Sequence, residues 1–311
     1  MLPRPSEADV DEATRSFKRR TTAVEGASPR QVNSLGPSAK KCLGWIIYFA
    51  EAIGGFSSKH SDVHVFLKDK TNGSKRAILW FRTVVRIWMR VRRPDIRRWE
   101  ESIPPAARFN NAPGRRVGDR VWRAKVRAEI CKDEKLEAVE TGGDLESCYD
   151  YVRWDKLARK AQRANYPMSI LRLSLQTYAA KRIIRAAGGI TSNPIQPRRG
   201  LGPGGGFSSS ELKAYFLEDI VNHNEQHPNA PIEMHVDDYL CDAQGKVAES
   251  VANEVAASLK GFARIVRNLK LPVAWQKGRT IATTKELAAS VVRKAGMIAG
   301  IVKSATICLA S

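Results

Sequence analysis

Two adjacent carboxylates after a short apolar strand constrain this sequence more than any other feature. Ile232 to Val236 is predicted to form the strand, and Asp237 and Asp238 follow it directly. Like charges this close repel each other, and neighbouring side chains on a strand point to opposite faces. A turn after the strand would bring both carboxylates to one cation. The pair therefore indicates either a simple polar turn or part of a metal site.

A third acid supports the metal site. Asp144 follows Gly142 and Gly143 and precedes an apolar and aromatic stretch. Carboxylate oxygens are the hard ligands that Mg²⁺ prefers, and two such ions about 3.5 to 4 Å apart clamp the attacking and leaving oxygens of a phosphoryl transfer. If the pair is a metal site rather than a simple turn, its expected ligands are Asp144, Asp237 and Asp238, and the expected ion is Mg²⁺, with Mn²⁺ as the alternative.

The charge of the chain indicates its class of partner. The 311 residues include 52 Lys and Arg against 32 Asp and Glu, a formal net charge of +20. Between Lys75 and Arg127 there are 16 Lys and Arg against 4 Asp and Glu, with four tryptophans interleaved. Such an excess predicts a polyanionic partner, either a nucleic acid or an anionic membrane.

A nucleic acid is the better expectation. The longest apolar runs, Cys42 to Phe56 and Ala295 to Ala310, are short for a membrane span, and each carries a charged residue. The five cysteines are scattered without a C-x-x-C pair, which is typical of a reducing, intracellular setting. The sequence does not distinguish the nucleus from the cytoplasm.

The predicted elements mix strands and helices without a strict alternation, which indicates an α+β fold. Asn72-Gly73 separates two β-prone runs and predicts a basic hairpin. Gly200 to Gly206 is a glycine-rich loop that precedes a helix. Further expected elements are helices over 167–188, 208–222 and 246–269, and strands over 271–275 and 279–283.

Taken in order, these motifs resemble the sequence blocks of the reverse transcriptase family, most closely those of non-LTR retroelements and group II introns. The first catalytic block of that family has an Asp, four residues, an aromatic residue and often a second Asp, as at Asp144, Tyr149 and Asp150. The aromatic-x-Asp-Asp block is similar to His235-Val236-Asp237-Asp238. The resemblance extends from about Val63 to Lys285 and implies a right-hand polymerase fold with fingers and an antiparallel palm sheet backed by helices.

The resemblance also implies roles in catalysis. Asp144 and Asp237 would hold two metal ions, with Asp238 as the supporting carboxylate. Lys277 matches the lysine of a later block and would protonate the leaving pyrophosphate as a general acid. Tyr149 would lie beneath the incoming sugar, where its ring would clash with a 2′-hydroxyl.

The family likeness assigns the remaining nucleotide contacts to the hairpin and the glycine-rich loop. Lys70 and Arg76 would close on the triphosphate, and Lys68 or Lys75 would replace Lys70 if the register slips. Gly200 and Gly204 would let template and nucleotide approach the backbone closely. The implied partners are an RNA template, a DNA primer and deoxynucleoside triphosphates.

Some residues depart from the family pattern. Pro203 stands where the family usually has a glutamine, and His235 replaces the usual Tyr or Phe. The expected regions are a flexible basic and polar segment (1–37), a fingers-like region (38–135), a palm-like region (136–290) and a truncated C-terminal segment (291–311). The expected thumb is short or absent.

Three functions follow from these features. The first is an RNA-directed DNA polymerase core. The second is a catalytically degenerate fold of the same kind that only binds RNA or an RNA–DNA hybrid, which the altered glycine-rich loop at Pro203 and the short or absent thumb would explain. The third is a metal-dependent nuclease that uses the same carboxylates. Two histidine pairs, His60 with His64 and His223 with His227, have the spacing of half a zinc site but lack further ligands nearby.

Overall fold

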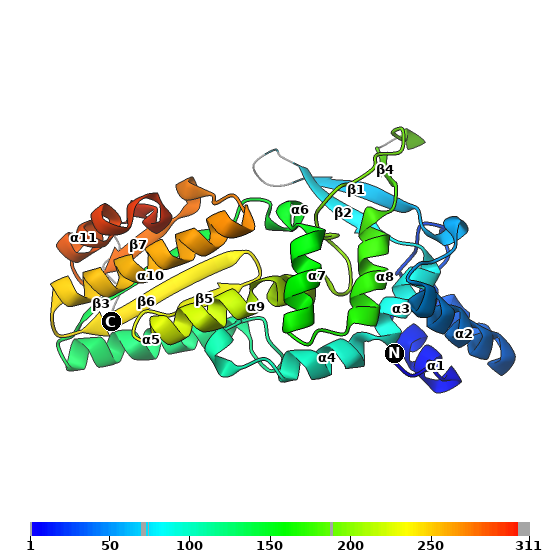
Figure 1. Ribbon diagram of the computed structural model, residues 1–311, viewed down its shortest axis with the longest axis horizontal. Helices are drawn as coiled ribbons and strands as arrows, with labels where there is room; N and C mark the ends of the chain where they lie inside the picture. The colour runs from blue at the N-terminus through cyan, green and yellow to red at the C-terminus, as the bar shows by residue number, and fades with distance from the viewer. Residues whose placement is uncertain (1, 70–72, 74, 187–188, 304–311) are drawn as a thin grey trace. The chain divides into compact units, whose positions relative to one another are not determined.

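The computed structural model describes residues 2–69, 73, 75–186 and 189–303. These residues form two compact units, each built from two stretches of the chain (Figure 1). The first unit comprises Met1–Trp99 and Val152–Tyr215, and the second comprises Glu100–Tyr151 and Phe216–Ser311. The prediction of an α+β fold is confirmed in its coarse form, because both units contain a sheet together with helices.

The first unit is built around a small mixed sheet with the strand order β2-β1-β4. The predicted basic hairpin is present, because β1 (Val63–Asp69) and β2 (Lys75–Trp80) pair antiparallel. Strand β4 (Arg182–Arg185) pairs with β1 in parallel. The helices are α1 (Glu7–Arg15), α2 (Pro37–Ile53), α3 (Thr83–Val91), α4 (Arg93–Glu101, which ends in the second unit), α7 (Trp154–Arg163) and α8 (Met168–Ala179).

The second unit contains a five-stranded sheet with the order β5-β6-β3-β7-β8. Its strands are β3 (Glu137–Asp144), β5 (Ile232–His235), β6 (Asp238–Gly245), β7 (Arg279–Ala282) and β8 (Ile301–Val302). All neighbours pair antiparallel except β7 and β8, so the sheet is mixed rather than purely antiparallel as expected. The helices are α5 (Val117–Asp133), α6 (Cys148–Tyr151), α10 (Ala248–Leu269) and α11 (Lys285–Ala295), and α9 (Ser208–Gln226) begins in the first unit.

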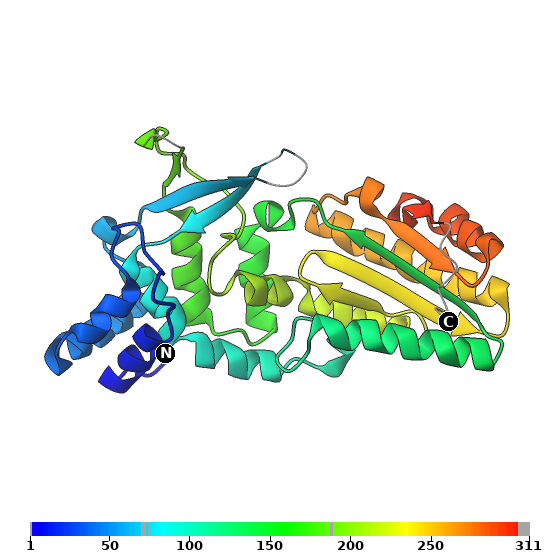
Figure 2. The ribbon, with the colours of Figure 1, turned by 180° about the vertical axis from the view of Figure 1, so that it is seen from behind.

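Helix α10 shows why one face of the larger sheet is covered. Val247, predicted on the apolar face of this helix, is its N-cap and is 61% exposed. The other residues predicted on that face, Val251, Val255, Leu259, Phe262 and Val266, are all at most 2% exposed. These side chains recur every three or four residues, so they form one face of the helix. Helix α10 contacts β3 and β6, and α11 contacts β7. Figure 2 shows the opposite face of this sheet, with α5 running along one side of it.

Two predicted elements differ from the structure. The helix expected over 167–188 ends at Ala179, and the β-branched run that follows forms β4 instead. This strand forms because Ile183 and Ile184 gain backbone pairing with β1. Leu271 to Trp275 forms only an isolated bridge between Val273 and Leu145.

The N-terminal 37 residues, expected to be aperiodic and flexible, contain α1 and a 3₁₀ helix (Pro29–Ser34). A capping box between Ser6 and Asp9 begins α1, and Val10 and Ala13 are buried. Packing against α2 and α3 stabilises this segment, although its composition resembles that of a disordered one.

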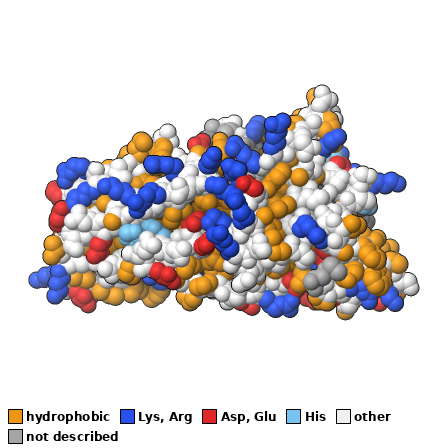
Figure 3. All heavy atoms as spheres, viewed as in Figure 1, with side chains coloured by type: hydrophobic (Ala, Val, Ile, Leu, Met, Phe, Trp, Pro, Cys, Tyr) orange, Lys and Arg blue, Asp and Glu red, His pale blue; other side chains and the backbone are white. Residues whose placement is uncertain are grey.

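The exposed surface agrees with the basic composition. On the face shown in Figure 3, Lys and Arg side chains are more numerous than Asp and Glu side chains, and hydrophobic side chains gather over α2. The exposed apolar residues of α2 include Trp45, Ile46, Phe49 and Ile53. Within the described residues, no helix combines the length and the apolar character needed to cross a membrane.

A buried carboxyl group lies in the first turn of α9. Glu211 is fully buried and accepts a hydrogen bond of 2.6 Å from Tyr178 Oη, and Tyr178 Oη lies 3.1 Å from Ser208 Oγ. Ser208 Oγ in turn donates to the carbonyl of Gly202, 2.6 Å away. Loss of hydration raises the pKa of Glu211 to about 7, although the hydrogen bond from Tyr178 opposes this shift.

We expect Glu211→Gln to remove part of the pH dependence of stability. Between about pH 4.5 and 7 the unfolded chain releases this proton while the folded chain keeps it. The free energy of unfolding therefore falls as the pH rises through this interval, by roughly 3 kcal/mol from this group. Chemical unfolding at pH 4.5 and 7.5 measures the effect. Glu286→Gln, an exposed glutamate in the first turn of α11, is the matched control and should leave the pH dependence unchanged.

Candidate functional site

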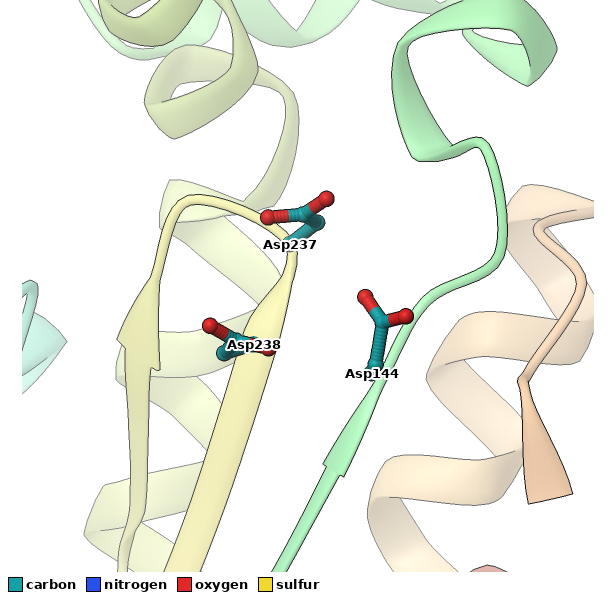
Figure 4. Close-up of side chains that lie close together, drawn as sticks. All are labelled: Asp144, Asp237 and Asp238. Carbon is teal, nitrogen blue, oxygen red and sulfur yellow. The ribbon is translucent and has the colours of Figure 1, made fainter. Parts of the chain in front are cut away.

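Three carboxylates from two neighbouring strands meet in the second unit (Figure 4). Asp144 ends β3, Asp237 lies in the turn between β5 and β6, and Asp238 begins β6. One oxygen from each lies within 4.8 Å of the others. Among the residues that the structure describes, this is the only group of three or more His, Cys, Asp or Glu side chains close enough to hold a metal ion.

Backbone pairing fixes this meeting. Asp144 lies directly opposite Asp238 in the antiparallel pair of β3 and β6. Beyond the strands, Leu145 N donates to the carbonyl of Asp237 over 2.9 Å, and Ala274 N donates to the carbonyl of Asp144 over 2.9 Å. Backbone hydrogen bonds of each acid or of its strand therefore bring the three carboxylates together.

The turn that carries Asp237 is strained. Val236 has a φ of 61°, a region that favours glycine and that a β-branched residue rarely adopts. The turn nevertheless joins His235 directly to Asp238 across the β5–β6 pair. Strain of this kind persists only where surrounding structure imposes it, and it is concentrated at functional sites.

The three acids repel one another, and one lysine partly compensates. Loss of hydration, together with the charges of Asp237 and Asp144, raises the pKa of Asp238. Lys277 Nζ forms an ion pair with Asp144 Oδ2. This hydrogen bond is the largest cause of the raised pKa of Lys277, so the ammonium group stays protonated. Two-thirds of the Lys277 side chain is exposed, whereas that of Asp144 is 15% exposed.

The acids fit a hard divalent cation. All three ligand groups are carboxylates, the donor type that Mg²⁺ and Mn²⁺ take. Loss of hydration and, after it, the charges of Asp237 and Asp144 raise the pKa of Asp238, and a bound cation would favour its charged form. Asp144, Asp237 and Asp238 could therefore hold metal ions, as the sequence predicts.

A close approach of β3 and β6 places a glycine next to Asp144. A Cβ atom on Gly143 would lie 2.3 Å from Tyr239 Oη and 2.5 Å from Tyr239 Cζ, so no side chain fits there. Tyr239 is buried and donates to the carbonyl of Ile298 over 2.8 Å. From the sequence, Gly143 is only a glycine that precedes Asp144. In the structure, the packing of Tyr239 against β3 requires a glycine at this position.

The predicted nucleotide-binding residues are divided between the two units. Tyr149 is half-buried in α6 of the second unit, and Arg76 is exposed on β2 of the first unit, opposite Lys68. Lys70 lies outside the described residues. Their contacts with a nucleotide stay a prediction.

The glycine-rich loop packs against strand β2 within the first unit. Gly200 and Gly204 both have a φ of 96°, so each needs a residue that tolerates the left-handed region. A Cβ atom on Gly204 would lie 3.0 Å from the carbonyl oxygen of Leu79, and Leu79 N donates to the carbonyl of Pro203 over 2.8 Å. The loop is thus seated on strand β2.

Histidine pairs do not add a second metal site. His223 is buried and lies 2.9 Å from Ser258 Oγ, and burial lowers the pKa of His223 to about 4. His64 is also buried, and it lies 3.3 Å from Asp62. Neither pair belongs to a group of three possible metal ligands among the described residues.

Sequence reasoning missed three features of the site. The strain at Val236 and the Tyr239 ring against Gly143 depend on strand register, which the sequence does not specify. Lys277 and Asp144 are 133 residues apart along the chain, and their direct contact depends on β7 lying beside β3. The family likeness signalled Lys277 itself, but nothing in the sequence signalled its contact with Asp144.

Neither a family model nor a curated protein matches this sequence. The solved structures that match include apo telomerase from Candida tropicalis truncated from the C-terminal domain, with 13% identity and a TM-score of 0.52. That match covers 86% of this chain and 60% of the other. A second structure, apo telomerase from Candida tropicalis, matches with 12% identity and a TM-score of 0.50 and covers 74% of this chain and 45% of the other. The chain thus spans less than two-thirds of either telomerase chain, and it has a telomerase-like, reverse-transcriptase-like fold.

We expect Gly143→Ala to destabilise the second unit by about 2 kcal/mol, because the added methyl group would overlap the ring of Tyr239. Gly142→Ala is the matched control, since its Cβ atom would lie 3.1 Å from Leu240 Cδ1 and 3.3 Å from the carbonyl oxygen of Tyr239, both longer than the contacts at Gly143. Urea unfolding should show a clearly larger loss for Gly143→Ala. Equal losses would contradict the close approach of Tyr239.

Proposed function

We propose that this chain is the core of an RNA-directed DNA polymerase that adds deoxynucleotides to a primer 3′ end. One observation carries the proposal: Asp144, Asp237 and Asp238 converge within 4.8 Å on a fold similar to that of telomerase. Carboxylates at the ends of paired strands suit phosphoryl transfer, because they would hold metal ions, and that reaction needs positive charge concentrated at the reacting phosphate. The excess of Lys and Arg is consistent with a nucleic-acid partner.

The acids and Lys277 would have different roles in catalysis. Asp144 and Asp237 would hold two Mg²⁺ ions, and Asp238 would support them. When bound, these ions would supply Lewis-acid charge at the reacting phosphate. Lys277 is exposed and protonated beside Asp144, and it would donate its proton to a leaving pyrophosphate.

The substrates would be an RNA template, a DNA primer and deoxynucleoside triphosphates. Arg76 and Lys70, on or next to the arms of the hairpin, would contact the triphosphate. Gly200 and Gly204 would leave the backbone of their loop open to template and nucleotide. Tyr149 would exclude the 2′-hydroxyl of a ribonucleotide. In this proposal the region 38–135 corresponds to fingers and the region 136–290 to a palm.

Primer extension tests the polymerase directly. With an RNA template, a DNA primer, deoxynucleotides and Mg²⁺, we expect extension that Asp237→Asn lowers by about 10²- to 10³-fold. Asp133→Asn, the same change at an exposed carboxylate at the end of α5, should retain activity. Extension that survives Asp237→Asn, or no extension by the parent chain, would refute the catalytic role.

Tyr149 is tested by its effect on sugar discrimination. Tyr149→Ala should raise the use of ribonucleotides relative to deoxynucleotides by about tenfold or more, because the ring that would meet the 2′-hydroxyl is removed. The ratio of the two kcat/KM values is the measurement. Tyr149→Phe retains the ring and should retain discrimination; a similar loss in both variants would exclude a steric role for the ring.

A second candidate function is nucleic-acid binding without catalysis. The ion pair of Lys277 with Asp144 favours it, because the lysine supplies part of the positive charge that a metal ion would otherwise provide. The departures at Pro203 and His235 are consistent with it. Salt-dependent binding of RNA by the parent chain, together with no extension in Mg²⁺ or Mn²⁺, would select this function.

A further inference from the structure

A row of arginines in the first unit faces a cavity. Arg86 and Arg90 are one helical turn apart on α3, and Arg93 begins α4 three residues later. All three line one cavity of about 450 Å³. Apart from Thr83 at its start, the rest of α3 is apolar and buried, so the row lies on the polar side of a mostly buried helix.

Three other segments of the first unit wall this cavity. Strand β2 contributes Trp80, the glycine-rich loop contributes Gly204 and Gly206, and the N-terminal segment contributes Phe17 and Thr22. The N-terminal segment is fixed in place, because Trp80 Nε1 donates to the carbonyl of Thr22 over 2.9 Å and Arg86 donates to the same carbonyl. The cavity is therefore built from parts that the fold holds together.

These arginines differ from their neighbours in lacking carboxylate partners. Arg82 forms two hydrogen bonds with Asp62, of 2.5 and 2.8 Å, and the buried Arg92 forms an ion pair with the buried Glu51. Across the described part of the chain, by contrast, no ion pair involves the three arginines of the row. Carboxylates therefore neutralise the charges of Arg82 and Arg92, but not those of the three arginines in the row.

The guanidinium groups are nevertheless held in position. Arg90 lies over the ring of Phe17 at 5.0 Å and Arg86 at 5.5 Å, distances typical of cation–π contacts. Burial, followed by repulsion from the next arginine in the row, lowers the pKa of both groups. Only one donor of Arg86 is used by Thr22, so most of the five N–H donors on each guanidinium stay available.

The row indicates a ligand with linked phosphates. Arg86 and Arg90 are separated by a rise of roughly 6 Å along α3, and Arg93 extends the row past the end of that helix, so the row exceeds the reach of one phosphate group. Arginine binds phosphate through two parallel hydrogen bonds, and the half-exposed indole of Trp80 offers a surface on which a base could stack. The cavity volume suits a unit of nucleotide size, and a duplex would exceed it.

We propose that this cavity binds the phosphate backbone of a single-stranded nucleic acid, with Arg86, Arg90 and Arg93 contacting successive phosphates. Phe17 orients the two helical arginines, and Trp80 receives a base. The inference shares its class of partner with the proposed polymerase but rests on residues of the first unit alone. Binding here would persist even if the chain had no polymerase activity.

Fluorescence anisotropy with a labelled 15-nucleotide single-stranded RNA, in EDTA and without nucleotides, tests the site. We expect Arg86→Gln with Arg90→Gln to weaken binding about tenfold or more, and the slope of log Kd against log salt to fall by about 1.4, or 0.7 for each lost phosphate contact. Lys41→Gln with Lys59→Gln removes two exposed charges of the same unit away from the cavity. This control should change both values little.

The other arms distinguish the alternatives. Arg86→Lys with Arg90→Lys keeps the charge and should retain more affinity than the glutamine pair, and thermal unfolding verifies that each variant folds. Equal weakening by the control and by the glutamine pair would overturn the proposal. Competition by free tripolyphosphate as strong as competition by unlabelled RNA would also overturn it, because the site would then serve a small phosphorylated ligand.

Asp237→Asn separates this inference from the proposed function. That variant should bind the single strand like the parent chain while losing primer extension. If the parent chain does not extend a primer but the glutamine pair still loses RNA affinity, the polymerase proposal fails and the binding site stands. If extension occurs and the glutamine pair binds RNA normally, the opposite holds.

Discussion

Mutual repulsion among three carboxylates is the constraint on which the candidate site depends. If they lay on mobile loops, the side chains of Asp144, Asp237 and Asp238 would move apart, because their negative charges repel one another. They stay together because the β3–β6 register and two further backbone hydrogen bonds hold their main chains. The sheet thus holds the carboxylates together against their repulsion. The packing of α10 and α11 against that sheet stabilises this arrangement.

Local chemistry explains what could be predicted from the sequence. The hairpin around Gly73, the apolar stripe of α10 and the acids at strand ends are each encoded within a few residues, and all appear in the structure. The grouping of Asp144 with Asp237 required knowledge of the order in which family motifs occur. Periodicity alone would have left Asp237 and Asp238 as an ordinary turn.

Features that depend on distant pairing could not be predicted. Helix α8 ends early because β1 offers its edge to Ile183 and Ile184, and nothing within 167–188 signals that edge. The aromatic side chains likewise divide by tertiary context: Trp88 and Trp99 are core residues, whereas Trp122 is 68% exposed on α5. Val236 violates a local conformational preference, so sequence rules argue against the turn that it forms.

The N-terminal segment has a consequence for how the chain is handled. Phe17 and Thr22 belong to a stretch that a sequence-based trimming scheme would remove as a disordered leader, yet their ring and carbonyl contact Arg90, Arg86 and Trp80. A shortened chain would expose the underside of α3 and release its arginines from their aromatic support. Such a chain would lack part of the wall of the arginine-lined cavity, so it would not be a minimal version of this one.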